Sequence, residues 1–320
     1  AIHYRAVPEK SEQLTHEISS VISQHKDYSL QSGKMVLEAK PSGANKGVCL
    51  QAAMETAPFA GRLSVMIGDD KTDEDAFLVA NKLGGWSIKV GEGESAANYR
   101  LGIVGNGTIA GLINARGDYE WFCLPRFDGE PVFNKLLGGG GSFSVWMEGL
   151  SKRTQSYDRN TAILRTRMES EDGAILEIVD FAPRFERKGR TFRPVSLVRR
   201  FEVIAGTPQL KISLTPETDW GGRRLKPIRG VNHVRFVDEE FSFRVTTDAP
   251  VSYILTETSF VLDKDVTFIL GADESLTDSP SVIARDWEER TRQYWAKWAR
   301  SLAVPFEWQD EVIRAAITLK

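Results

Sequence analysis

Apolar positions in the first hundred residues change repeatedly between strand spacing and helix spacing. Leu14, Ile18 and Ile22 recur at helical intervals and predict an amphipathic helix over 11–25, and a second helix is predicted over 45–55. Short apolar runs predict strands at 1–4, 28–30, 35–39, 63–67 and 86–90. Strands that alternate with helices are typical of a parallel α/β sheet.

Two local features refine this pattern. The run Leu63-Ser64-Val65-Met66-Ile67 is nearly continuous in apolar residues, which predicts a strand buried on both faces. A helix is expected after it and ends at Gly84-Gly85, because glycine commonly terminates helices. The strands at 28–30 and 35–39 are expected to be joined by a turn at Ser32-Gly33.

The pattern changes near Leu101, after which short alternating segments and turns continue to about residue 280. The alternating segments are 162–167, 176–181, 197–203, 210–214, 241–245, 251–255 and 266–270. Their spacing is typical of an antiparallel β-sandwich. Helical spacing returns over 281–302, where Trp287, Trp295 and Trp298 share one face, and a further helix is expected from Trp308 to the end. We expect the tryptophan face to pack against the sandwich or another domain.

Composition narrows the class of protein. With 320 residues, 41% of them hydrophobic and 27% charged, the chain is long enough for two domains with ordinary cores. A net charge of −3 gives no electrostatic reason to expect nucleic acid or a membrane surface as partner. The two cysteines fall in different predicted domains, so we expect no disulfide framework and a cytoplasmic setting. The first residue is Ala1, which suggests a piece of a longer protein.

An acidic loop follows the strand at 63–67. Gly68 is followed by Asp69 and Asp70, at the strand tip where open α/β sheets bind ligands. Magnesium prefers oxygen ligands from one or two carboxylates, so Asp69 is the expected direct ligand and Asp70 a direct or water-mediated one. Asp73 is a third candidate metal ligand. The alternative is that Thr72 caps the next helix and the acids favour its positive end.

Lys46 is the second candidate. It stands in Asn45-Lys46-Gly47, at a predicted helix start. A cation beside the free amides of a helix N-terminus forms a phosphate pocket. A lysine near a turn is more commonly only solvated, and its place one strand–helix step before the acidic loop is what makes it a catalytic candidate.

Six segments in order carry a family resemblance. They are Ala1-Ile2-His3-Tyr4-Arg5, Val36-Leu37-Glu38-Ala39-Lys40-Pro41, Asn45-Lys46-Gly47, Pro58-Phe59-Ala60-Gly61-Arg62, Gly68-Asp69-Asp70-Lys71-Thr72-Asp73-Glu74 and Val90-Gly91-Glu92-Gly93. Together they resemble the C-terminal half of trehalose-6-phosphate phosphatases of the haloacid dehalogenase superfamily. The resemblance implies that Asp69 holds Mg²⁺ and that Lys46 steadies the phosphoryl group. It also implies that Arg5, Glu38 and Lys40 face the sugar of trehalose 6-phosphate from a small cap domain.

One departure from that family bears on activity. The family's nucleophile comes from an Asp-x-Asp motif on its first strand, and that segment would precede Ala1. Asp73-Glu74-Asp75 belongs to the later motif and does not replace it. Without an aspartate nucleophile no phospho-aspartyl intermediate forms, so we expect this chain alone to be inactive as a phosphatase.

The remainder of the chain resembles a different family. Asp118-Tyr119-Glu120-Trp121-Phe122-Cys123-Leu124-Pro125-Arg126-Phe127-Asp128, Val179-Asp180-Phe181-Ala182-Pro183-Arg184 and Val304-Pro305-Phe306-Glu307-Trp308 resemble family 15 glycoside hydrolases, the glucoamylase and trehalase-like group. In that family a β-sandwich precedes an (α/α)6 barrel that carries the catalytic glutamates. Trp121, Arg126 and Asp128 could lean over a sugar. The alternative, which we favour, is that Trp121 and Phe127 are core and that Arg126 and Asp128 form a structural pair.

The fold class expected is therefore multidomain. An α/β haloacid-dehalogenase-like part spans 1–101, with a cap remnant at 1–41 and a core at 42–101. An all-β antiparallel sandwich spans 102–280, and 281–320 hold a linker helix and the start of an (α/α)6 barrel. The function expected for the intact protein is magnesium-dependent dephosphorylation of trehalose 6-phosphate with a fused α-glucoside hydrolase. The alternatives are a glycosidase with a relic phosphatase half and a non-catalytic carbohydrate-binding module.

Overall fold

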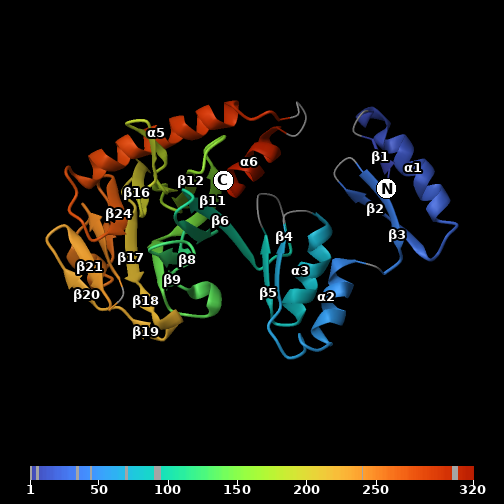
Figure 1. The fold of residues 1–320 in the computed structure, drawn as a ribbon, viewed down its shortest axis with the longest axis horizontal. Coiled ribbons are helices and arrows are strands. Elements are labelled where there is room, and N and C mark those ends of the chain that lie inside the picture. The colour runs from blue at the N-terminus through green and yellow to red at the C-terminus, as the bar shows by residue number, and fades with distance from the viewer. Residues whose placement is uncertain are drawn as a thin grey trace. The chain divides into compact units, whose positions relative to one another are not determined.

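The computed structural model describes residues 2–4, 7–33, 36–43, 45–68, 71–89, 95–239, 241–304 and 309–320. The chain divides into two units, Ala1–Arg100 and Leu101–Lys320 (Figure 1). The first unit mixes helices with parallel and antiparallel strands, whereas antiparallel strands dominate the second. Among the described helices, none combines the length and the apolar character needed to cross a membrane.

The first unit begins with a three-stranded antiparallel sheet and one helix. The sheet has the order β1-β3-β2 and its elements are β1 (Ile2–His3), the turn η1 (Pro8–Lys10), α1 (Ser11–Ile22), β2 (Tyr28–Gly33) and β3 (Val36–Pro41). Ser32 pairs with Leu37 and Gly33 with Val36, so the turn expected at Ser32-Gly33 is wrong. Small polar residues fit within a ladder because its hydrogen bonds come from the backbone.

Alternating strands and helices complete the first unit. They are α2 (Lys46–Met54), β4 (Val65–Gly68), the turn η2 (Lys71–Asp73), α3 (Glu74–Lys82) and β5 (Trp86–Lys89). Strands β4 and β5 pair in parallel, and β5 pairs in parallel with the first residues of β6 (Tyr99–Gly105). The parallel arrangement predicted from the alternation is therefore confirmed. The Asn45 side chain caps α2 by accepting a hydrogen bond from the Val48 amide at 2.8 Å.

The burial expected for β4 is wrong on one face. Val65 is 51% exposed and Ile67 58% exposed, whereas Met66 and Gly68 between and after them are half-buried. Successive residues of a strand point to opposite faces of the sheet. Helix α3 contacts β4 and β5. Within the described part of the unit, Val65 and Ile67 therefore lie on a face that remains open.

Two antiparallel sheets form the second unit. The first has the order β23-β17-β10-β8-β7-β6, with β9 also paired to β8. The second has the order β11-β12-β13-β16-β24-β22-β21-β20. The strands of the first sheet after β6 are β7 (Ala110–Asn114), β8 (Tyr119–Leu124), β9 (Glu130–Phe133), β10 (Ser142–Met147), β17 (Gln209–Thr215) and β23 (Phe260–Val261). Those of the second are β11 (Leu150–Tyr157), β12 (Leu164–Ser170), β13 (Ile175–Phe181), β16 (Ser196–Ala205), β20 (Pro227–Arg229), β21 (His233–Val237), β22 (Ser242–Thr247) and β24 (Val266–Ala272).

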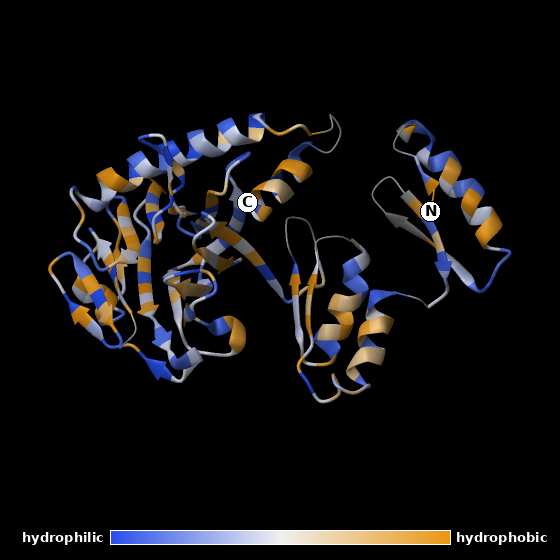
Figure 2. Ribbon diagram, in the orientation of Figure 1, coloured by the Kyte–Doolittle hydropathy of each residue, from blue (hydrophilic) through white to orange (hydrophobic). Residues whose placement is uncertain are grey.

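Large aromatic side chains join the two sheets. Phe143 of the first sheet meets Phe268 of the second with ring centroids 5.3 Å apart, and Phe268 in turn contacts Phe201 at 5.5 Å. All three are buried in one continuous apolar cluster. Figure 2 shows apolar and polar positions alternating along these strands, as expected when one face of each strand is buried. The sandwich predicted from the alternation is confirmed.

One predicted strand is wrong. Residues 251–255 form a short helix, α4 (Val251–Leu255), that begins after Pro250. Val251 and Ile254 are its buried residues, at the i,i+3 spacing of a helix face. A five-residue apolar run does not distinguish a strand from a buried helical turn, and tertiary packing decides here.

Two helices end the chain. Helix α5 (Pro280–Arg300) packs on the outer side of the second sheet, and α6 (Gln309–Leu319) packs on α5. Trp295 is buried between them, while Trp287 and Trp298 are partly buried at either side. The packing role predicted for the tryptophan face is confirmed. Trp308, the predicted start of the last helix, lies outside the described residues.

Candidate functional site

Two candidates from separate motifs meet in the first unit. The Lys46 ammonium (Nζ) donates a hydrogen bond to Oδ1 of Asp73 at 2.6 Å. Lys46 is the first residue of α2, and Asp73 closes the turn η2 immediately before α3. The Asp73 side chain is 5% exposed and that of Lys46 is 53% exposed. The pair therefore has a buried carboxylate at the tip of β4 and an ammonium group that solvent reaches.

Two glycines make this meeting possible. A side chain on Gly68 would overlap the Asp73 carboxyl group, so only glycine lets the chain leave β4 beside it. A methyl group on Gly47 would lie 2.5 Å from the Asp75 carbonyl oxygen. Close approach of α2 to α3 at Gly47 is what brings the first residue of α2 to the last residue of η2.

The alternative role of these residues at the helix end is only partly confirmed: Glu74 and Asp75 lie in the first turn of α3, where acids favour the positive end, but Thr72 is not its N-cap. Asp73, rather than Thr72, is the N-cap of α3. The Asp73 backbone is already helical, and its side chain makes no capping hydrogen bond. The Asp73 carboxylate accepts a hydrogen bond from Lys46 instead of capping α3.

The chain after β5 is tied to the same corner. The Glu74 carboxylate accepts a hydrogen bond from the Ala96 amide at 2.7 Å, and the Asn81 amide donates to the Ala96 carbonyl at 2.8 Å. These bonds hold the backbone of Ala96 against α3. Lys89 is buried at the end of β5, in register with Gly68. We did not predict Lys89, although a lysine at the end of the strand segment Trp86-Ser87-Ile88-Lys89 was a visible signal.

Asp69 and Asp70, the other two predicted metal ligands, lie outside the described residues. Within the part of the chain that is described, no three His, Cys, Asp or Glu side chains gather as a metal site. The donors that are described fit a magnesium–phosphate site. A carboxylate oxygen is a hard ligand for the cation, and an ammonium group suits a phosphoryl oxygen.

Two of the three predicted sugar-contacting residues, Glu38 and Lys40, belong to the small sheet. Glu38 and Lys40 stand two positions apart on β3 and so share one face of that strand. Glu38 lies opposite Gln31 and Lys40 opposite Ser29 on β2, and Glu38 is exposed to solvent. Arg5 lies outside the described residues.

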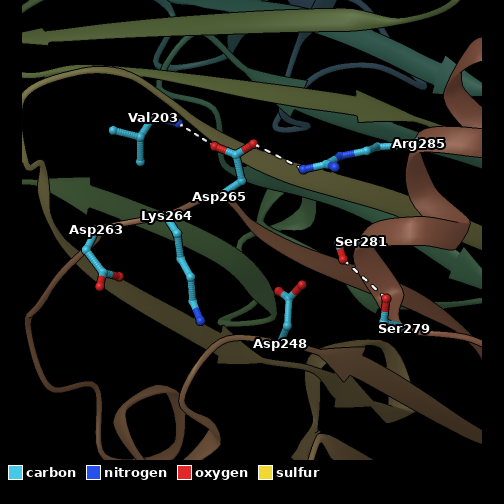
Figure 3. A pocket seen from close by; sticks show the side chains of 8 residues that line it. All are labelled: Val203, Asp248, Asp263, Lys264, Asp265, Ser279, Ser281 and Arg285. Atoms are coloured by element: carbon cyan, nitrogen blue, oxygen red, sulfur yellow. Dashed lines mark hydrogen bonds and ion pairs between the residues drawn. The ribbon is translucent and has the colours of Figure 1, made fainter.

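A polar pocket of about 650 Å³ opens in the second unit, beside the start of α5 (Figure 3). The Asp265 carboxylate accepts from the Val203 amide at 3.0 Å and lies 3.7 Å from the Arg285 guanidinium. Asp248 accepts from the Thr267 amide at 2.6 Å, and burial raises the pKa of its carboxyl group. Both acids already accept hydrogen bonds from the backbone, and Asp265 also pairs with Arg285 of α5. We therefore interpret the pocket as a structural contact at the N-terminal end of α5 and not as a reaction centre.

The segment Trp121 to Asp128 gives a mixed outcome. Arg126 and Asp128 form the predicted pair, with Nη2 and Oδ2 3.0 Å apart. Phe127 was expected in the core and is wrong, because its side chain is exposed at the turn. Trp121 on β8 is half-buried. Burial raises the pKa of the nearby Cys123 thiol to about 11, which keeps it protonated and unreactive at neutral pH.

Two family models match the chain, in the same order as the two resemblances found in the sequence. Residues 1–102 match the family model described as trehalose-phosphatase. Residues 89–258 match the model described as trehalase-like, N-terminal, which covers more than half of the chain.

Individual relatives follow the same division. A trehalose-6-phosphate phosphatase of Escherichia coli (strain K12) is 44% identical over 101 residues, which are 32% of this chain and 38% of that protein. A probable trehalose-phosphate phosphatase of Sinorhizobium fredii is 38% identical over 116 residues, 36% of this chain and 44% of that protein. A trehalase of Thermoplasma volcanium is 27% identical over 239 residues, 68% of this chain and 36% of that protein. The chain spans less than half the length of each of these relatives.

Proposed function

We infer the function of this chain from its membership: it belongs to the trehalase-like family through residues 89–258, and it carries a trehalose-phosphatase domain over residues 1–102. We propose that the first unit supplies part of the centre of a magnesium-dependent phosphohydrolase, of the haloacid-dehalogenase type, that acts on trehalose 6-phosphate. The observation that carries the proposal is the 2.6 Å bond between Lys46 and Asp73, where two motifs distant in the sequence converge.

In this proposal the acidic loop holds the metal. Asp69, Asp70 and Asp73 are the carboxylates that would bind Mg²⁺, which when bound offsets charge on the transferring phosphoryl oxygens. Lys46 is held in place by Asp73, and its positive charge would face a phosphoryl oxygen. The N-terminal amides of α2 beside it add positive potential for the same anion. Arg5, Glu38 and Lys40 are the proposed contacts to the sugar hydroxyls.

For the second unit we propose a supporting role in α-glucoside hydrolysis. The match to the trehalase-like N-terminal model and the likeness to the Thermoplasma trehalase favour this function. The sandwich would precede an (α/α)6 barrel, with α6 as the first barrel helix. No residue of this chain is assigned to the glycosidic bond cleavage itself.

Phosphate release from trehalose 6-phosphate by the full-length protein tests the first proposal. With Mg²⁺ present, Asp69→Ala is expected to abolish turnover, while Asp27→Ala, an exposed acid of the same unit, leaves it unchanged. A chelator is expected to abolish wild-type turnover as well. Unchanged activity in Asp69→Ala would remove that residue from the site, and release by the 320-residue chain alone would contradict its expected inactivity.

A further inference from the structure

Trp220 stands at the tip of a short hairpin in the second unit. Strands β18 (Glu217–Thr218) and β19 (Arg223–Arg224) pair, and residues 219–222 connect them. The side chain is exposed, at 63% of its full area. Its backbone lies in the left-handed region, with φ 54° and ψ 35°, and Asp219 before it has φ 53°.

This conformation is unfavourable for tryptophan. A positive φ brings a large side chain against its own backbone, and glycine or asparagine normally occupies such turn positions. The exposed indole also leaves a large apolar surface in water. Neither feature helps the hairpin to fold, so the residue type at this position calls for another explanation.

The surrounding structure fixes the loop without using the indole. The Trp220 amide donates to Oε1 of Glu130 at 3.0 Å. The Thr218 hydroxyl lies 3.0 Å from Oε2 of Glu130 and 2.7 Å from Oδ2 of Asp238. Arg223 donates to Oδ1 of Asp238 at 2.6 Å, and this bond lowers the pKa of the Asp238 carboxyl group. The backbone of the loop is therefore held by these side-chain hydrogen bonds while the ring stays accessible.

We propose that Trp220 is a stacking platform for a glucose ring of an α-glucoside. The face of an indole ring carries negative potential, and the C–H groups on one side of a pyranose ring carry weak positive potential, so the two stack. Asp219 and Arg223 belong to the same hairpin, are both exposed and pair with each other at 3.2 Å, and this pair carries an acceptor and donors for sugar hydroxyls. An apolar protein partner would have to desolvate these charges, whereas a hydroxyl-rich ligand satisfies them. The proposal rests on the α-glucoside role proposed above for the second unit.

Calorimetric titration of the full chain with maltoheptaose, a linear α-glucan, tests the platform. Trp220→Ala is expected to weaken binding about tenfold, the loss of one stacked ring contact. Trp146→Ala is the matched control, because Trp146 is also exposed, at 51%, but lies in the regular strand β10. The control is expected to bind as the wild type does, and Trp220→Phe is expected to recover most of the lost affinity.

A second variant separates binding from folding. Trp220→Gly removes the ring and relieves the left-handed backbone, so its thermal midpoint is expected to equal or exceed that of the wild type while binding is lost. A lower midpoint would make Trp220 a structural residue and overturn the proposal. Equal binding by wild type and Trp220→Ala would overturn it and leave the α-glucoside role standing. No binding by the wild type would also overturn it, and α-glucoside hydrolysis by the full-length protein then tests the proposed function separately.

Discussion

A buried ion pair in the sandwich allows the sharpest stability prediction. Arg199 on β16 and Asp180 on β13 are both almost fully buried. Two N–H groups of the Arg199 guanidinium donate hydrogen bonds to the Asp180 carboxylate, from Nε to Oδ1 at 2.7 Å and from Nη2 to Oδ2 at 3.0 Å. It also donates to the carbonyl oxygens of Gly117 at 2.6 Å and Phe143 at 3.3 Å. Four bonds from one side chain thus join both sheets at their centre.

Replacing Arg199 with methionine keeps an unbranched apolar stem and removes every donor. Among the described residues, Asp180 would keep the Tyr119 hydroxyl, at 3.2 Å, as its side-chain donor. Removing one partner of a buried pair leaves a buried charge without compensation and costs about 3–5 kcal/mol. Two carbonyl acceptors also lose their partner. The double variant Arg199→Met with Asp180→Leu removes the charge as well, so we expect it to recover much of the loss.

The pH dependence of Arg199→Met follows from the same burial. Burial raises the pKa of the Asp180 carboxyl group even beside Arg199, and without Arg199 the pKa rises further. A folded-state pKa above the unfolded value, about 3.9, gives stability that is present below the unfolded pKa and is lost as pH rises through the folded pKa. The variant is therefore expected to be less destabilised at pH 5 than at pH 7.5.

Urea unfolding followed by tryptophan fluorescence measures this effect. Seven of the eight tryptophans lie beyond Leu101, so the signal reports mainly the second unit. Midpoints of wild type, both single variants and the double variant at the two pH values complete a double-mutant cycle. If Arg199→Met lowers the free energy of unfolding by less than about 1 kcal/mol, or by the same amount at both pH values, the reasoning is refuted.

Two further predictions concern close packing and charge. Gly47→Ala would place a methyl group against the Asp75 carbonyl oxygen and should lower the free energy of unfolding by about 1–3 kcal/mol. Cys49→Ala, on the exposed side of the same helix, is the control and should lower it little. Thermal midpoints measured by calorimetry compare the two variants. Glu288→Gln removes the buried carboxylate that binds Arg165, Arg200 and Arg292, and it should lower the free energy of unfolding by about 1–3 kcal/mol. This loss should change little in 1 M salt, because salt screens buried ion pairs weakly. A loss that vanishes in salt would place Glu288 in an ordinary surface pair.

Local patterns predicted most of the helices and strands. The helix predicted over 45–55 matches α2 within one residue at each end, and the stripe of Trp287, Trp295 and Trp298 predicted α5 with its buried face. Patterns failed where a short segment depends on its neighbours. Residues 251–255 read equally well as strand or helix, and the exposure of Val65 depends on which elements cover β4.

The candidate site was predictable in its residue types and not in its contacts. Lys46 and Asp73 could each be selected because Lys46 stands at a predicted helix start one strand–helix step before the acidic loop that contains Asp73. The hydrogen bond between them could not be predicted, because it depends on the approach of α2 to α3 at Gly47. Lys89 was not among the predicted site residues, because the segment 86–90 predicted only a strand. The sugar contacts proposed for Arg5, Glu38 and Lys40 remain predictions.

Unfavourable features of the second unit separate into two kinds, and the difference bears on function. The buried charges of Arg199 and Asp180 are costly, but their bonds to each other and to Gly117 and Phe143 offset that cost within the fold. The left-handed backbone of Trp220 is held by Glu130, yet an indole that is 63% exposed gives the fold little apolar burial in return. A feature that the fold itself compensates needs no ligand to explain it. Trp220 is costly and leaves its large side chain in solvent, so its explanation is best sought in what the indole contacts outside the described chain.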